Sequence, residues 1–281
     1  MGKTETQIRE ALSTSKRLRE IGFKVYTKGS YANRTNVRLD YDVDIAVECT
    51  DFHFSDSSGA AADVQKMAEA KREAYKKAYT TQGFKNDVEN ALVAYYGRTA
   101  VTRGNLAMRV REKKTTLPAD VVPCFEYRRI YGVDRYGNLL YHKGSRLYPD
   151  NGAYIHNWSD QQLQCGNAKN DVTKRRYKRM VRALKRLENL LVQSKVIAEL
   201  PSFFMECLVY NVPNDHFNHN TYVADMRAVL AAIFNATLND EACKSWLEVS
   251  ELKYLFHASQ GWNRSQAHAL ANHGWNVMGF Q

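Results

Sequence analysis

The 281-residue sequence has no apolar run long enough to cross a bilayer, and its N-terminal residues contain no apolar region of the kind found in signal peptides. It also lacks any Cys-x-x-Cys pair, since its five cysteines are scattered along the chain: Cys49, Cys124, Cys165, Cys207 and Cys243. A disulfide framework and a zinc knuckle are therefore disfavoured. We expect a cytoplasmic protein without a membrane partner.

The composition is that of an ordinary globular protein, with 44% hydrophobic and 25% charged residues. The length suits one large domain or two packed ones. The formal net charge of +10 is typical of proteins that bind polyanions, because lysine and arginine neutralise phosphates. A basic surface kept for solubility is the alternative, and charge alone does not separate a nucleic-acid binder from an enzyme that uses nucleoside triphosphates.

Apolar periodicity divides the chain into a mixed half and a helical half. We predict a mixed αβ domain over residues 1–170 and a helical domain over residues 171–281. The predicted helices of the first half lie at 6–19, 60–79 and 85–96, the strands at 23–26, 41–48, 107–111 and 119–127, and a hairpin at 129–141.

Two acidic residues, Asp42 and Asp44, stand two positions apart on the strand predicted at 41–48. Side chains at positions i and i+2 of a strand point to the same face, with a rise of roughly 6.8 Å between them. Such a pair can share two hard cations about 3.5–4 Å apart, as phosphoryl transfer requires, and magnesium prefers oxygen ligands. A single Asp-x-Asp pair is weak support for a metal site, since such pairs also occur on protein surfaces without a catalytic role.

Two further features favour a catalytic interpretation. Gly29-Ser30 predicts a tight turn that brings backbone N–H groups and a hydroxyl against phosphate, where a larger side chain would block the approach. Asp120 stands in the otherwise apolar segment 117–123. Because an unpaired buried carboxylate is costly, Asp120 requires a cation or a hydrogen-bonded role. A strand-end acid in water or in a salt bridge is the structural alternative.

Taken together, Gly29-Ser30, Asp42-Val43-Asp44-Ile45 and Asp120 resemble the signature of the polymerase-beta-like nucleotidyltransferase superfamily. More narrowly, residues 29–38 and 119–124 are similar to the CD-NTases, bacterial relatives of cyclic GMP–AMP synthase and oligoadenylate synthase. The resemblance covers nearly the whole chain. It implies an α+β fold, in which a nucleotidyltransferase core on a mixed sheet packs against a C-terminal helical domain, with the active site in the cleft between them.

The same resemblance implies roles for individual residues of the core. Asp42 and Asp44 would bridge two Mg²⁺ ions, with Mn²⁺ as an alternative metal. Asp120 would complete the site of the ion that activates the attacking hydroxyl. Gly29 and Ser30 would hold the phosphates of the nucleoside triphosphate.

A strongly basic segment, residues 169–186, begins the helical half and carries nine lysines and arginines. On a helix, Lys178, Arg182 and Lys185 fall on one side, beside the apolar stripe. A phosphate-binding row and a solvated face both fit this pattern. In CD-NTases a helix of this kind faces the catalytic acids, so the resemblance implies that these residues bind the triphosphate. Lys185 is the first candidate for this role.

The segment 200–206 also looks like part of the family. By that resemblance Ser202 would begin a helix and offer its hydroxyl to phosphate, near the favourable end of the helix dipole. Phe203 would stack on a nucleobase, which aromatic rings do with little preference for the base. Core packing is the alternative for Phe203 and for its neighbour Phe204.

No Cys/His cluster with zinc-ligand spacing accompanies His216 and His219, which we interpret as part of a polar loop. Activation by double-stranded DNA through a zinc thumb is therefore not implied. We expect nucleoside triphosphates as partners and no specific nucleic acid. The resemblance also suggests regulatory proteins of a defence operon as partners, whereas the sequence indicates no oligomeric state.

The resemblance implies that a nucleotidyl group passes from a triphosphate such as ATP to a ribose hydroxyl, with release of pyrophosphate. A second transfer would close a cyclic di- or trinucleotide, a second messenger of the anti-phage systems called CBASS. One alternative is a nucleotidyltransferase that modifies an RNA end, a protein or a small molecule. Another is an inactive nucleotide- or RNA-binding relative, against which the three aspartates argue.

Overall fold

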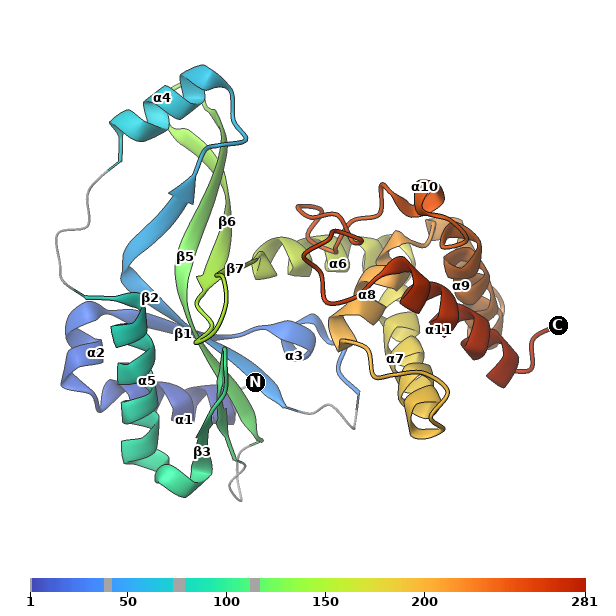
Figure 1. Cartoon of the computed structure of the whole chain (residues 1–281), viewed down its shortest axis with the longest axis horizontal. Coiled ribbons are helices and arrows are strands. Elements are labelled where there is room, and N and C mark those ends of the chain that lie inside the picture. Colours follow the sequence, from blue (N-terminus) through green and yellow to red (C-terminus); the bar gives the residue numbers. More distant parts are fainter. Residues whose placement is uncertain (1, 38–41, 73–78, 112–116) are drawn as a thin grey trace. The chain divides into compact units, whose positions relative to one another are not determined.

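The computed structural model describes residues 2–37, 42–72, 79–111 and 117–281 and has two compact units (Figure 1). The sheet unit comprises Met1–Tyr31 and Tyr41–Ser159, and the helical unit comprises Ala32–Asp40 and Asp160–Gln281. The α+β class expected from the sequence is confirmed. The domain boundary predicted at 170/171 falls inside helix α6 (Ser159–Val172).

The sheet unit is built on a seven-stranded mixed sheet with the order β1-β2-β5-β4-β3, in which β6 also pairs with β5, and β7 pairs with β6. Strands β2 and β5 are parallel, whereas the other pairs are antiparallel. The strands are β1 (Phe23–Thr27), β2 (Val43–Asp56), β3 (Val101–Arg103), β4 (Met108–Val110), β5 (Ala119–Val133), β6 (Leu139–Leu147) and β7 (Ile155–Asn157).

Strict alternation along β2 separates the two faces of the sheet. Val43, Ile45 and Val47 are buried in one cluster with residues of α1 (Gly2–Ser13) and α5 (Thr81–Tyr96). Because successive side chains of a strand point to opposite faces, Asp44 lies on the face that these helices leave open. The apolar pattern that predicts the strand thus also directs its acids away from the helices.

Two predicted helices differ from those in the structure. The helix predicted at 6–19 is interrupted: α1 ends at Ser13, and Ser15 caps a second helix, α2 (Lys16–Ile21), by accepting a hydrogen bond from Leu18 N. Serine competes for backbone hydrogen bonds and so favours caps over helix interiors. The helix predicted at 60–79 is the shorter α4 (Ala62–Ala70), and residues 73–78 of that prediction lie outside the described residues.

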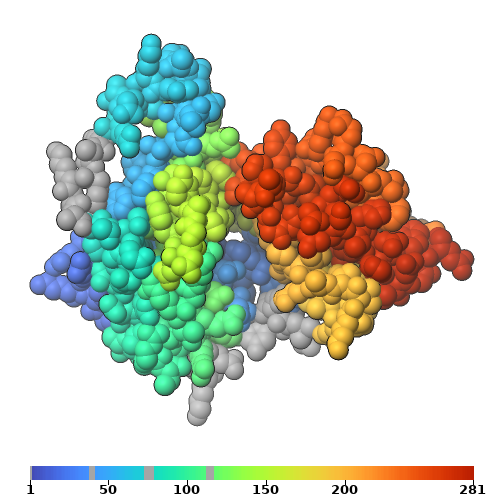
Figure 2. Space-filling model, in the orientation of Figure 1, coloured from blue at the N-terminus to red at the C-terminus, as the bar shows by residue number. Residues whose placement is uncertain are grey.

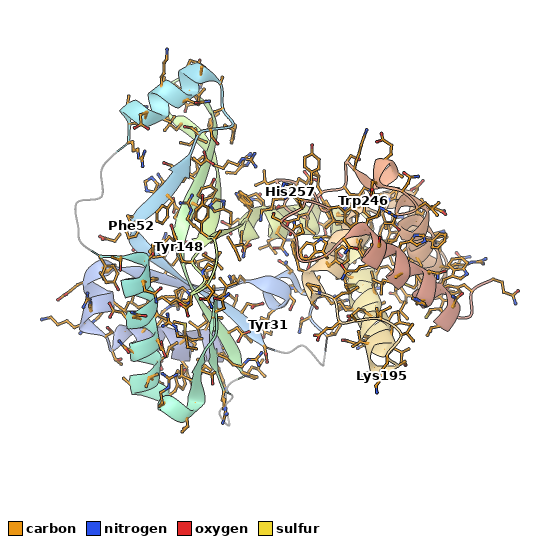
Figure 3. All side chains as sticks on the ribbon, viewed as in Figure 1. Tyr31, Phe52, Tyr148, Lys195, Trp246 and His257 are labelled. Carbon is orange, nitrogen blue, oxygen red and sulfur yellow. The ribbon has the colours of Figure 1, made fainter. Side chains whose placement is uncertain are left out.

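Strands β2 and β5 both continue beyond the predicted strands and extend the sheet. Since they are parallel, their C-terminal ends lie at the same end of the sheet, where α4 follows β2 and contacts β5. Figure 2 shows α4, in cyan, projecting from the rest of the unit. At the base of the extension, Phe52 and Tyr148 (labelled in Figure 3) flank Phe125, with ring centroids 5.0 and 5.8 Å from it. This aromatic cluster joins β2, β5 and the chain after β6.

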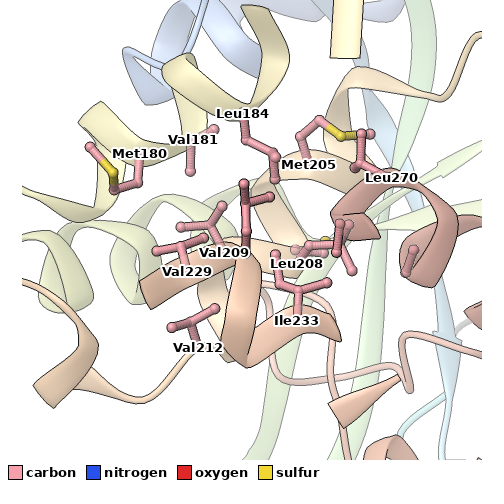
Figure 4. Close-up of a cluster of buried hydrophobic side chains, with 14 of the residues drawn as sticks. Met180, Val181, Leu184, Met205, Leu208, Val209, Val212, Val229, Ile233 and Leu270 are labelled. Carbon is pink, nitrogen blue, oxygen red and sulfur yellow. The ribbon is translucent and has the colours of Figure 1, made fainter. Parts of the chain in front are cut away.

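The helical unit packs α7 (Tyr177–Gln193), α8 (Ser202–Asn211), α9 (Tyr222–Ala236) and α11 (Arg264–Val277) around one apolar core. Figure 4 shows the contributions of α7, α8 and α9 to it, among them Leu184, Leu208 and Ile233. The described chain also contains α6 and the short helix α10 (Asp240–Cys243). Among the described residues, no helix combines the length and the apolarity needed to span a membrane.

Candidate active site

Three neighbouring strands bring the acids of the sheet unit together. Asp44 on β2 stands directly opposite Asp120 on β5 in the parallel register, and Asp42 lies just before β2 begins. On the other side of β5, Arg109 of β4 stands opposite Asp120. Paired residues of adjacent strands present their side chains to the same face, so all four charged groups belong to one edge of the open face.

Gly29 lies against the carboxylate of Asp44. Its φ of +66° falls in the left-handed region, and a Cβ added to it would lie 2.0 Å from Asp44 Oδ2. Any other residue would therefore collide with this acid. The turn predicted at Gly29-Ser30 is the start of a five-residue helix, α3 (Gly29–Asn33). The structure shows a contact with Asp44 that requires glycine, and the approach of phosphate stays a prediction.

Arg109 makes an ion pair with each of two acids. Its Nη2 lies 3.2 Å from Asp42 Oδ2, and its Nε lies 3.4 Å from Asp120 Oδ1. The side chain of Arg109 is 64% exposed, that of Asp42 43% and that of Asp120 30%. Ion pairs as solvated as these contribute little, about 1 kcal/mol or less each. The arginine is thus a weakly held counter-ion that another cation can displace.

The donor set suits a hard divalent cation, because carboxylate oxygens are its preferred ligands. A positive group already lies across two of the three acids. In the part of the chain that the structure describes, no three acidic, histidine or cysteine side chains converge as a metal-binding group. Like charges repel at short range, so carboxylates without a cation between them are expected to stay apart. The acids therefore fit the predicted metal by chemistry and strand position.

Two of the predicted phosphate-binding residues, Lys178 and Lys185, are buried in the helical unit. Their exposed fractions are 8% and 2%. Lys178 Nζ donates to Asn167 Oδ1 at 2.5 Å, and both ammonium groups act electrostatically on the carboxylate of Glu206. Burial raises the pKa of Glu206 above its usual value, while the hydrogen bond from Thr35 and the two lysines oppose that rise. A solvated face is therefore excluded for these two lysines.

Arg182 is half-buried and donates from Nη1 to the backbone carbonyl of Arg34 at 2.6 Å. Burial, together with the neighbouring charges of Arg179 and Arg186, lowers the pKa of its guanidinium. Arg34, whose carbonyl it binds, has a φ of +57°, a backbone conformation that is strained for any residue with a Cβ. Arg182 thus holds the segment after α3 within the helical unit, a role that the sequence did not indicate.

Ser202 is the first residue of α8, as predicted, although the cap position is Pro201. Phe203 is partly buried, with its ring centroid 6.2 Å from that of Trp262 in an edge contact. Phe204 is fully buried and stacks on Trp262 at 5.2 Å. Phe204 is thus the core residue of the pair, and base stacking by Phe203 stays a prediction.

Sequence reasoning missed Arg109 and Glu206. The pairing of Arg109 with Asp120 depends on strand register, which the sequence does not reveal. Glu206, in contrast, stands alone among apolar residues in α8, the same signal that singled out Asp120. A lone acid in an apolar segment requires partners when it is buried, so this pattern also indicates a role for Glu206.

The chain is similar to known proteins in both sequence and structure. Residues 164–279 match the family described as the cGAS/DncV-like nucleotidyltransferase C-terminal helical domain. A cyclic dipyrimidine nucleotide synthase, CdnE, of Cecembia lonarensis is 35% identical over 284 residues, covering 99% of this chain and 91% of that protein. A second one, from Legionella pneumophila, is 35% identical over 98% of this chain and 90% of its own length. The chain belongs to the CD-NTase family.

Solved structures of the family agree with this assignment. The Rhodothermus marinus CdnE c-UMP-AMP synthase, solved with Apcpp and Upnpp, matches with a TM-score of 0.81 at 28% identity, over 98% of this chain and 89% of that one. The Elizabethkingia meningoseptica CdnE cyclic dinucleotide synthase, solved with GTP and Apcpp, matches with a TM-score of 0.77 at 31% identity, over 99% and 91%. The CD-NTase studied here is accordingly a nucleotidyltransferase of the group that makes cyclic nucleotides, which confirms the enzyme class expected from the sequence.

Proposed function

We propose that this CD-NTase joins two nucleoside triphosphates into a cyclic dinucleotide in a reaction that depends on a divalent metal. The observation that carries the proposal is the register of Asp44 opposite Asp120, with Asp42 beside them and the backbone of Gly29 against Asp44. These residues supply three carboxylates on one face of the sheet, next to a glycine. Nucleotidyl transfer from a triphosphate needs such a set of oxygen ligands for its metal ions.

In this proposal Asp42, Asp44 and Asp120 hold two magnesium ions, or manganese in their place. When bound, the metal supplies charge neutralisation at the phosphates and lowers the pKa of the attacking hydroxyl. Gly29 leaves room for the carboxylate of Asp44 and Ser30 offers a hydroxyl. Arg109 pairs with Asp42 and Asp120 and would compete with the ions for these carboxylates.

Residues of the helical unit hold the phosphates and the base. Lys185, Lys178 and Arg182 provide positive charge for the triphosphate. Ser202 provides a hydroxyl, and Phe203 provides a ring for a base. The burial of the lysines supports this assignment, because a charge removed from water acts more strongly on phosphate than a solvated one does.

The relatives named above make products with different bases, described as dipyrimidine or as c-UMP-AMP. The two proteins at 35% identity are both dipyrimidine synthases, so UTP and CTP are the first substrates to test. We further propose that the product is a second messenger in anti-phage defence of the CBASS type and that the enzyme acts in the cytoplasm.

The test is to incubate the purified protein with each radiolabelled triphosphate, alone and in pairs, with magnesium or manganese. A product that resists phosphatase after the reaction has no free phosphate end and supports a cyclic dinucleotide. A linear, phosphatase-sensitive product, or label transferred to added RNA or protein, would instead support the alternative activities. No reaction with any pair of triphosphates would support an inactive nucleotide-binding relative.

A further inference from the structure

The interior of the helical unit contains a carboxylate that its apolar core does not need. Glu206 lies in the middle of α8 and is 3% exposed, between the core residues Met205 and Cys207. A leucine there would extend the core, whereas a buried acid is costly unless its oxygens are paired. Its presence therefore calls for a role other than packing.

The partners of Glu206 come mainly from one distant segment. Asn33 Nδ2 donates to its Oε1 at 3.1 Å and the Thr35 hydroxyl donates to its Oε2 at 2.9 Å. Gln162 of α6 adds a longer hydrogen bond of 3.4 Å. Asn33 and Thr35 are themselves buried, and Arg182 binds the carbonyl of the residue between them. Residues 33–35 are thus held in the helical unit by side chains on both sides.

This segment is the continuation of the candidate active site along the chain. Gly29 and Ser30, at the start of α3, belong to the sheet unit, and Tyr31 (Figure 3) packs against the apolar core of that unit. Asn33, at the other end of the same short helix, belongs to the helical unit. The chain then leads on to Asp42. Residues 33–35 therefore lie between the glycine that Asp44 requires and the first of the acids.

Glu206 also receives the electrostatic influence of Lys185 and Lys178, the predicted phosphate-binding lysines. The same carboxylate thus interacts with the lysines of α7 and with the segment that joins α3 to the acids. Glu188, another buried acid of the helical unit, accepts a hydrogen bond from Leu200 N.

We infer that Glu206 is a positioning residue, whose carboxylate fixes residues 33–35 and thereby the end of helix α3, which begins with Gly29 and Ser30 of the candidate active site. The inference rests on the proposed function for its catalytic consequence. The anchoring of residues 33–35 is a separate property that can be measured in the absence of any substrate.

The experiment compares Glu206→Gln, Glu206→Met and Thr35→Val with Glu188→Gln and Glu188→Met, which change an equally buried acid of the same unit. Hydrogen exchange of the nucleotide-free proteins is followed in peptides covering residues 29–37. We expect exchange at 33–37 to become about tenfold faster in Glu206→Met, because local opening no longer breaks the two hydrogen bonds. Glu206→Gln keeps one acceptor oxygen and should lie between wild type and Glu206→Met.

Steady-state kinetics with the triphosphates that give product in the test above then separate a positioning role of Glu206 from a role in folding. We expect kcat to fall by about tenfold or more in Glu206→Met, with a smaller change in KM, because small displacements of catalytic groups strongly affect the chemical step. Thr35→Val should act in the same direction with a smaller effect. The Glu188 variants are expected to lower thermal stability while leaving both exchange at 33–37 and kcat unchanged.

Unchanged exchange at 33–37 in folded Glu206→Met would overturn the inference, as would an equal loss of kcat in Glu188→Met. If Glu206→Met does not fold, Glu206→Gln and Thr35→Val decide the question by the same two readouts. Absence of any product from the wild-type protein would count against the proposed function alone, because the exchange measurement would still show whether Glu206 anchors the segment.

Discussion

The two sets of charged residues in the proposed site differ in their exposure to water. In the sheet unit, Asp42, Asp120 and Arg109 are solvated and joined by long ion pairs. In the helical unit, Lys185, Lys178 and Glu206 are buried and act on one another. Solvated ion pairs are weak and easily exchanged, whereas removal of one member of a buried set leaves an uncompensated charge.

The difference indicates which part of the proposed site is held in place by the fold. Lys185 and Lys178 are already removed from water in the helical unit. The acids of the sheet unit are left available, with a displaceable arginine as their counter-ion. Substitutions should therefore act mainly on chemistry in the sheet unit, and on both binding and stability in the helical unit.

The largest effect is expected from Asp42→Ala combined with Asp44→Ala. Product formation should fall below detection, because the metal ions lose the ligands that they share. The melting temperature should not fall, since removing neighbouring like charges relieves repulsion. Product is measured with labelled triphosphates and stability by thermal unfolding. Asp51→Asn, on the same strand away from the acids, is the control that should keep its activity, and turnover by the double variant at the wild-type rate would refute the assignment.

The next effect is expected at Lys185. Lys185→Met keeps most of the side-chain volume but removes the charge, so KM for the triphosphate should rise by about ten- to a hundredfold, the range for a lost hydrogen bond to a charged group. A contact with phosphate that persists through the reaction stabilises the bound substrate and the transition state about equally, so kcat should change less. Stability should also fall, because Glu206 loses a compensating charge. Lys195→Met, at an exposed position in the turn that follows α7 (Figure 3), should change neither quantity. A normal KM in folded Lys185→Met would assign phosphate binding to another residue.

A smaller effect in the opposite direction is expected at Arg109. Removal of a competing cation by Arg109→Ala should tighten Mn²⁺ binding to the nucleotide-free protein by about fivefold, in proportion to the ~1 kcal/mol of an exposed ion pair. Electron paramagnetic resonance of free Mn²⁺ measures this without any turnover. Arg135→Ala, in the distant β5–β6 turn, is the matched control. Weaker Mn²⁺ binding by Arg109→Ala would mean that the arginine orients the acids for the metal.

How much the sequence predicts also differs between the units. Alternation around Asp42 and Asp44 predicted the central strand and the face of its acids, because that pattern depends only on local geometry. The end of β2 was missed, since its polar residues mark an extension beyond the apolar core, whereas the end of β5 lies in the hairpin predicted at 129–141. Helix α6 was also missed, because its polar sequence has no apolar stripe. The partners of Arg109 and Glu206 depend on contacts between segments distant in sequence, which no local pattern contains.

The smallest expected effect concerns pH and Lys169, a half-buried cation of the helical unit. Burial lowers the pKa of this lysine to about 8, although its ammonium donates to Val212 O and Asn214 Oδ1 at 2.8 Å each. An unfolded lysine titrates near pH 10.4, so between about pH 8 and pH 10.4 the unfolded chain binds more protons than the folded one, and stability rises with pH. Below pH 8 both states are protonated and the full desolvation penalty remains. We expect the free energy of unfolding to rise by no more than about 1 kcal/mol, because the group is partly solvated and its hydrogen bonds favour the charged form.

Urea unfolding at pH 8 and pH 10 measures this rise in wild type, in Lys169→Met and in the exposed control Lys174→Met. The rise should disappear only in Lys169→Met, and its persistence there would show that other groups produce it.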